Sequence, residues 1–105
     1  MLTLAGNIKF NNVDVYTTLR TEFLSDTCIR TIDCLYDNKS LELILEYDFH
    51  GNFRRGQANK YINNILANES IWYDNKIEQI GFFETLDSFW LSFAKHVFKV
   101  DIPAY

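Results

Sequence analysis

The stretch "TCIRTIDCLYDNKSLELILEYDF" (residues 27–49) decides the fold, because it reads as two strands joined by a tight turn. Across residues 40–49, apolar and polar side chains alternate with a single exception, Ile44, as expected for a strand with one buried face. The connecting segment "DNKS" contains Asp37 and Asn38, and both residue types tolerate the positive φ of a tight hairpin. The sequence therefore predicts an antiparallel hairpin of residues 27–36 and 40–49.

Three segments outside this hairpin are predicted to be helical, because their apolar side chains recur at spacings of three and four. These segments are residues 11–26, 57–70 and 85–100. Asn12 and Thr85 are suitable N-caps for the first and the last of them.

The two remaining segments complete the predicted architecture. Residues 2–10 read as a strand that can be interrupted at residues 5–7, and residues 71–83 fit either a second hairpin or a short helix. We therefore expect an α+β fold, in which a small, mainly antiparallel sheet of about three to five strands packs against about three helices. The length of 105 residues predicts a single domain, residues 1–105.

Composition and charge exclude several classes of function. Hydrophobic residues make up 48% of the chain and only one proline is present, which is typical of a folded domain rather than a disordered segment. The net charge of −4 argues against general nucleic-acid binding, which depends on Lys and Arg, but it suits a basic partner. No segment approaches the roughly 18 consecutive apolar residues of a membrane-spanning helix. We therefore expect neither nucleic acid nor a membrane as a partner.

The N-terminus and the cysteines predict a cytoplasmic location. Residues 1–10 lack the basic segment and the apolar run of a signal peptide. Cys28 and Cys34 would lie roughly 20 Å apart on one strand, whereas a disulfide requires Cα atoms within about 7 Å. Two free thiols are typical of a reducing compartment.

The chain lacks the residue spacings that mark zinc, calcium, P-loop and serine-hydrolase sites. Its only histidines are His50 and His96, and one interpretation is a two-histidine nuclease site with Arg54 or Arg55 as a phosphate clamp. The favoured interpretation is simpler, with His50 in a turn before Gly51 and His96 near a helix C-terminus, where the dipole stabilises cations. The sequence therefore predicts no catalytic residue, no cofactor and no metal ligand.

A row of carboxylates is the strongest candidate for a binding site. If the leucines of the second hairpin strand face the core, the acidic residues of that strand face outward and span roughly 20 Å. They are Glu42, Glu46 and Asp48, with the apolar Ile44 between them, and Asp33 on the neighbouring strand can extend the patch. One interpretation is an ordinary solvated face. The functional interpretation is a docking surface for a basic partner, with Ile44 as an apolar anchor.

A second candidate contact is the cluster of Trp72, Tyr73 and Asp74. Trp and Tyr are enriched at binding hot spots, and a turn at this point would expose one of the two rings. Alternatively, both rings fold into the core. Which side of the sheet would dock is left open by the sequence.

In its small size, its acidity and its lack of catalytic motifs, the chain resembles bacterial immunity proteins, such as those that protect cells from contact-dependent growth inhibition toxins. The resemblance implies a non-catalytic protein that neutralises a cognate toxin domain, for instance a nuclease, by covering its basic cleft with an acidic and aromatic surface. Glu42, Glu46 and Asp48 would then make the electrostatic contacts, with Trp72 and Tyr73 as anchors. A monomer or a weak dimer is expected.

Other classes of function remain open at this point. A phage-type protein inhibitor or nucleic-acid mimic would use the same acidic surface against a different target. A small secretion chaperone would be expected to dimerise and to expose an apolar groove. A small enzyme would depend on His50, Arg54 and Arg55.

Overall fold

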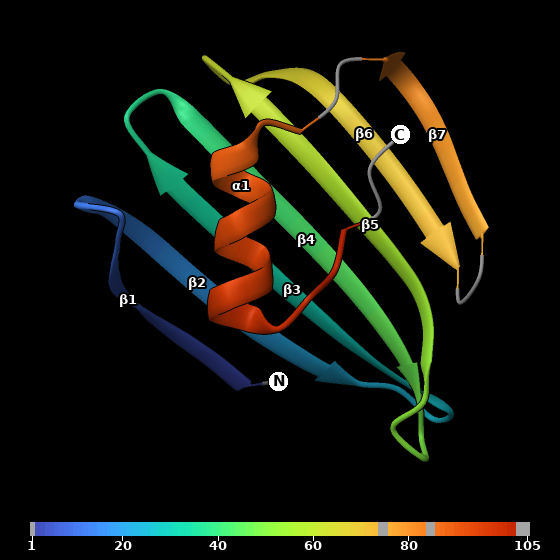
Figure 1. The fold of residues 1–105 in the computed structure, drawn as a ribbon. Coiled ribbons are helices and arrows are strands. Elements are labelled where there is room, and N and C mark those ends of the chain that lie inside the picture. The colour runs from blue at the N-terminus through green and yellow to red at the C-terminus, as the bar shows by residue number, and fades with distance from the viewer. Residues whose placement is uncertain (1, 74–75, 84–85, 103–105) are drawn as a thin grey trace.

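The computed structural model describes residues 2–73, 76–83 and 86–102, and it consists of one antiparallel sheet followed by a short helix (Figure 1). The sheet has seven strands in chain order, so each strand pairs with the one before it. The strands are β1 (Leu2–Phe10), β2 (Val13–Phe23), β3 (Thr27–Tyr36), β4 (Lys39–Asp48), β5 (Phe53–Ile62), β6 (Ile65–Tyr73) and β7 (Lys76–Phe83). They are followed by α1 (Ser88–Phe93) and a π-helical segment, η1 (Ala94–Phe98).

The predicted α+β class is wrong, because the described residues are mostly β and their helical part is confined to α1 and η1. Residues 11–26 form β2 and parts of the turns that flank it, and residues 57–70 form the end of β5 and most of β6. Only the segment 85–100 contains the helix that its spacing predicts. Its N-cap is Asp87, and the expected cap Thr85 lies outside the described residues.

Two Asn–Asn pairs explain why the other two predicted helices are strands. Asn11 and Asn12 have φ angles of 49° and 63°, and Asn63 and Asn64 have φ angles of 52° and 65°. Two successive residues with positive φ form the type I′ turn that joins antiparallel strands, whereas a right-handed helix requires negative φ. Each pair therefore ends one strand and begins the next.

The hairpin predicted for residues 27–49 is confirmed as β3 and β4, with Asp33 opposite Glu42. Leu41, Leu43 and Leu45 are at most 1% exposed, so this side of β4 faces the core as expected.

The other two predicted strand segments are also present. The strand predicted at residues 2–10 is β1, and its pairing with β2 continues without a break through residues 5–7. Residues 71–83 adopt the hairpin alternative, as the end of β6 and β7, although residues 74–75 of the turn lie outside the described ranges.

α1 and η1 pack on one face of the sheet and form the hydrophobic core with it (Figure 1). Trp90 and Phe93 of α1 are fully buried. The ring centroid of Phe10 lies 5.4 Å from that of Phe93, and the centroid of Tyr36 lies 5.2 Å from that of Trp90. The opposite face, here called the open face, carries no helix from the described parts of the chain.

The two cysteines lie on the core side of β3, and both are free thiols. Cys34 is buried, which raises the pKa of its thiol to about 12, so it stays protonated at neutral pH. No helix in the described ranges has both the length and the apolar character needed to cross a membrane.

Candidate functional site

The open face is acidic across strands β1 to β6. The alternation of side chains along each strand, combined with the strand register, places seven carboxylates and three cations of the described residues on this face. The carboxylates are Asp14, Glu22, Asp33, Glu42, Glu46, Asp48 and Glu69, and the cations are Lys9, Arg20 and Arg55. The excess of negative charge therefore lies on one side of the molecule and is available to a partner.

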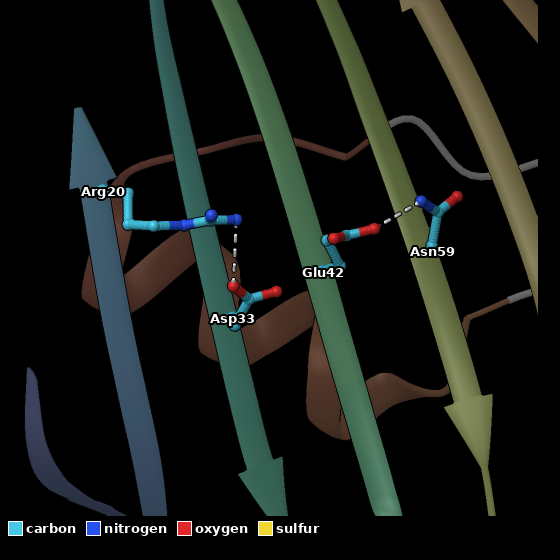
Figure 2. Close-up of polar contacts among 4 residues, drawn as sticks. All are labelled: Arg20, Asp33, Glu42 and Asn59. Carbon is cyan, nitrogen blue, oxygen red and sulfur yellow. Dashed lines mark hydrogen bonds and ion pairs between the residues drawn. The ribbon is translucent and has the colours of Figure 1, made fainter. Parts of the chain in front are cut away.

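A row of polar side chains crosses four strands at the centre of this face (Figure 2). Nη2 of Arg20 on β2 lies 3.7 Å from Oδ2 of Asp33 on β3, and Asp33 stands directly opposite Glu42 on β4. Nδ2 of Asn59 on β5 donates a hydrogen bond of 2.9 Å to Oε1 of Glu42. The helix lies behind the strands in this view, so the row belongs to the uncovered side.

Two carboxylates in this row face one another, and among the described residues a single guanidinium, that of Arg20, is in contact with them. Partial burial and the charge of Glu42 raise the pKa of Asp33, and the nearby Arg20 opposes this effect. Asp33 and Glu42 together therefore hold more negative charge than Arg20 neutralises. A cation supplied by a partner would relieve their mutual repulsion.

A hollow of about 400 Å³ adjoins the two carboxylates, towards the end of the sheet where the β3–β4 turn lies. Its lining combines Asp33 and Glu42 with three larger side chains, Tyr16, Leu35 and Tyr61. Tyr16 and Leu35 are each 49% exposed, so they offer apolar surface next to the charges. Burial, followed by the charges of Glu42, Glu69 and Asp33, raises the pKa of Tyr61, so its phenol remains a hydrogen-bond donor at neutral pH.

The remaining part of the predicted row follows β4 away from this hollow. Ile44 pairs with Thr31 and Gln57, and Glu46 pairs with Ile29 and Arg55, all by strand register. Nη2 of Arg55 donates to Oε1 of Gln57 over 3.1 Å, and Nε2 of Gln57 donates to Oδ1 of Asn59 over 3.1 Å. Because Arg55 stands beside Glu46, the negative charge is concentrated at the Asp33–Glu42 end.

Asp48 has a structural task at the end of β4. Its Oδ1 accepts hydrogen bonds of 2.9 Å from the backbone N–H groups of His50 and Asn52, and its Oδ2 accepts one of 3.2 Å from Nδ2 of Asn52. The backbone hydrogen bond from Asn52 is the main reason why the pKa of Asp48 is lowered. This carboxylate is therefore bonded within the turn before β5, and Asp33, Glu42 and Glu46 are the other acidic residues of the predicted row on the open face.

The aromatic cluster is divided between the two faces of the sheet. Trp72 is only 5% exposed and lies on the core side, where its ring packs over Gly56 and stacks at 6.3 Å on Phe53. Tyr73 is 41% exposed and pairs with Arg55, so it lies on the open face at the end of β6. Asp74 lies outside the described residues. Trp72 is therefore not placed to contact a partner of the open face.

Three surface side chains were not found by the sequence interpretation, namely Tyr16, Leu35 and Tyr61. Tyr16 and Tyr61 belong to the segments 11–26 and 57–70 that were predicted to be helical, whereas both lie on strands with their rings on the open face. Residues 13–21 also alternate with a period of two, which places Val13, Val15 and Leu19 on the face opposite Tyr16. This alternation was the signal that could have predicted a strand here.

The two histidines and Arg55, which the enzymatic alternative involves, each have their own local contacts. His50 is an exposed turn residue whose ring lies 4.0 Å from that of Phe49, while Arg55 is engaged with Gln57 on the open face. Nδ1 of His96 lies 2.9 Å from the carbonyl oxygen of Ser92, within the helical segment. Over the part of the chain that the structure describes, no group of three or more His, Cys, Asp or Glu side chains could hold a metal ion.

No family model matches the chain, and no curated protein and no solved structure is significantly similar to it.

Proposed function

We propose that this chain is a non-catalytic, cytoplasmic immunity-type protein, which neutralises a basic toxin domain by docking the open face of its sheet onto that domain. The observation that carries the proposal is the Asp33–Glu42 pair at the centre of the open face, next to a hollow with aromatic and apolar walls. Two facing carboxylates with a single guanidinium in contact favour a partner that brings a further cation.

The composition of the surface supports a protein partner. Its charged residues surround apolar and aromatic side chains, namely Ile44, Tyr16, Leu35 and Tyr73, which is the usual make-up of a protein–protein interface. The excess of carboxylates would repel a nucleic acid. A rigid sheet can present these groups without the entropic cost of ordering loops upon binding, which favours tight inhibition.

The positions of the side chains support a narrower choice of contact residues for the proposed interface. Glu42, Glu46, Ile44 and Asp33 share the open face, and Tyr73 lies at its border. Asp48 is already bonded within its own turn and Trp72 is in the core, so neither belongs to the proposed docking surface.

If the gene directly upstream of this chain encodes a large protein, as expected for an immunity-type protein, the test is co-expression of the chain with the C-terminal domain of that protein. We expect that domain to arrest growth when it is expressed alone, and to be harmless and to co-purify in a stoichiometric complex when the chain is present. A domain that is harmless alone, or one that remains toxic despite soluble expression of the chain, would contradict the proposal.

A further inference from the structure

Strand β1 forms one rim of the sheet, with β2 on one side and no element of the described chain on the other (Figure 1). It is nine residues long, contains no proline and no bulge, and has Lys9 as its only charged residue. Proteins usually protect such an edge by shortening it or by adding charges or proline. An unprotected edge of this kind is a template for another strand.

The β1–β2 turn determines which backbone groups of β1 point outward. In a two-residue hairpin the closing pair, here Phe10 and Val13, exchanges both of its hydrogen bonds, and this repeats at every second residue. Even-numbered residues of β1 therefore bond to β2. The free N–H and C=O groups at the outer edge belong to Thr3, Ala5, Asn7 and Lys9.

We propose that two copies of this chain pair through β1 in antiparallel orientation, with a two-fold axis at Gly6. This register places Thr3 opposite Lys9 of the second copy and Ala5 opposite Asn7, so every outward backbone group from Thr3 to Lys9 gains a partner. A shift by two residues in either direction leaves part of the edge unpaired. The symmetric register is the one that uses the whole strand.

The side chains of β1 fit the same register. On the core side of the sheet, Leu4 meets Ile8 of the second copy and Leu2 meets Phe10, in the non-hydrogen-bonded pairs that bring side chains closest together. Leu2 and Leu4 are 58% and 57% exposed in a single chain, so pairing would shield them. On the open face, Lys9 meets Thr3, and no like charges are opposed.

Gly6 allows close approach at the axis. A Cβ added to Gly6 would find no atom within 4 Å, and a hollow of about 230 Å³ lies beside it, lined by Leu4, Ile8, Leu19 and Phe98 among others. In the dimer two such hollows meet across the axis, and the exposed leucines of each copy lie next to them.

The dimer determines how the two open faces are presented; its formation does not depend on the proposed function, but this consequence rests on it. A two-fold axis perpendicular to the sheet keeps equivalent faces on the same side, so the two helices share one side and the two open faces share the other. One continuous sheet would then present both open faces in the same direction. Such a dimer could bind two partner molecules, or two sites of one partner.

The first experiment is sedimentation equilibrium of the wild-type chain and of Ala5→Pro. The N–H of Ala5 points outward, so proline removes an intermolecular hydrogen bond and leaves the β1–β2 bonds intact. We expect wild type to reach twice the 12.4 kDa mass of one chain and Ala5→Pro to be monomeric. Ala5→Val, which keeps the N–H, is the matched control and should remain dimeric.

The second experiment tests the register and does not rely on proline being tolerated. In a Cys28→Ser background, Gly6→Cys should form an intermolecular disulfide on mild oxidation, because the two Gly6 Cα atoms would lie about 4.5 Å apart. Leu4→Cys should not crosslink to itself, because its partner is Ile8. Thr3→Lys should weaken the dimer by opposing Lys9 of the second copy.

Three outcomes would overturn the inference. The first is a wild-type chain that stays monomeric at the highest concentration at which it remains in solution. The second is a dimer that persists in both Ala5→Pro and Thr3→Lys. The third is a polymer in place of a dimer, which would indicate that β1 pairs with the other rim of the sheet.

Discussion

The indole ring of Trp72 on β6 lies directly against the backbone of Gly56, its cross-strand partner on β5. A Cβ added to Gly56 would overlap the six-membered ring of the indole. The ring of Phe53 stacks on the same indole at 6.3 Å with an interplanar angle of 21°. The absence of a side chain at Gly56 thus gives Trp72 its place in the core.

Gly56→Ala should destabilise the protein by about 2 kcal/mol, because the methyl group has to displace a buried aromatic ring in a packed core. Urea unfolding followed by circular dichroism measures the change. The matched control, measured at a concentration at which the chain is monomeric, is Gly6→Ala, whose added methyl group has no neighbour within 4 Å in a single chain and should change the unfolding free energy by less than about 0.5 kcal/mol. Equal effects of the two substitutions would contradict the packing described for Trp72.

An ion pair fixes the start of the helix to the sheet. Nζ of Lys60 on β5 lies 3.2 Å from Oδ2 of Asp87, and the Lys60 side chain is only 10% exposed. Oδ1 of Asp87 accepts a hydrogen bond of 3.0 Å from the backbone N–H of Trp90. One carboxylate therefore caps α1 and also neutralises a buried ammonium group.

Asp87→Ala should cost about 3 kcal/mol, since it removes the cap and leaves the buried charge of Lys60 without this carboxylate. Asp87→Asn, which can still cap the helix, should cost less. Replacing the ammonium as well, in Lys60→Met/Asp87→Asn, should restore part of the stability lost in Asp87→Asn. The prediction fails if, in urea unfolding, the double variant is less stable than Asp87→Asn alone.

Asp33→Asn should stabilise the fold at neutral pH. The pKa of Asp33 is raised from 3.8 in the folded state, so the folded protein disfavours the ionised form. The protonated carboxyl group therefore makes its full contribution to stability below the pKa that it has in the unfolded chain. This contribution is lost as the pH rises through the pKa of the folded protein. The stability gain of Asp33→Asn over wild type should therefore be present at pH 7 and vanish below about pH 3.8.

Asp48→Asn is the control, because its effect on stability should have the opposite sign to that of Asp33→Asn. Hydrogen bonds from the turn lower the pKa of Asp48, so its carboxylate stabilises the folded state above the unfolded pKa, and this contribution is lost as the pH falls through the folded value. Asp48→Asn should thus be less stable than wild type at pH 7, with the difference shrinking in acid. Thermal unfolding across this pH range checks both variants, and parallel pH profiles would contradict both assignments.

The sequence of residues 13–23 fits the periodicity of a strand and also that of a helix. Val13, Tyr16, Leu19 and Phe23 recur at helical spacing, yet Val13, Val15 and Leu19 also follow a period of two. β-Branched residues favour strands, and the preceding Asn–Asn pair favours a type I′ turn over a helix cap. The same reasoning applies to Asn63 and Asn64, which interrupt the second predicted helix.

The sequence predicts those features of the candidate site that depend on alternation within one strand, and not those that depend on the register between strands. Alternation along β4 correctly separates the buried leucines from Glu42, Ile44 and Glu46. The face taken by Trp72 depends instead on the register between β5 and β6, which includes a shift between Lys60 and Tyr61. Registers between strands are set by side-chain packing and by bulges, and local sequence does not encode them.

The account depends most on the claim that the carboxylates of the open face dock a basic partner. Its most direct test is the association rate with the upstream-encoded domain at low ionic strength, for Glu42→Gln/Glu46→Gln and for the control Asp26→Asn/Asp101→Asn. Both variants lose the same net charge, but Asp26 and Asp101 lie outside the strands that carry the open-face carboxylates, Asp26 in the β2–β3 turn and Asp101 after the helix.

Because electrostatic attraction accelerates association mainly through charges that face the partner, the open-face variant should bind about tenfold more slowly than the control and with a weaker dependence on salt. Equal association rates for the two variants would contradict the account, since they would show that net charge, and not the open face, governs the encounter.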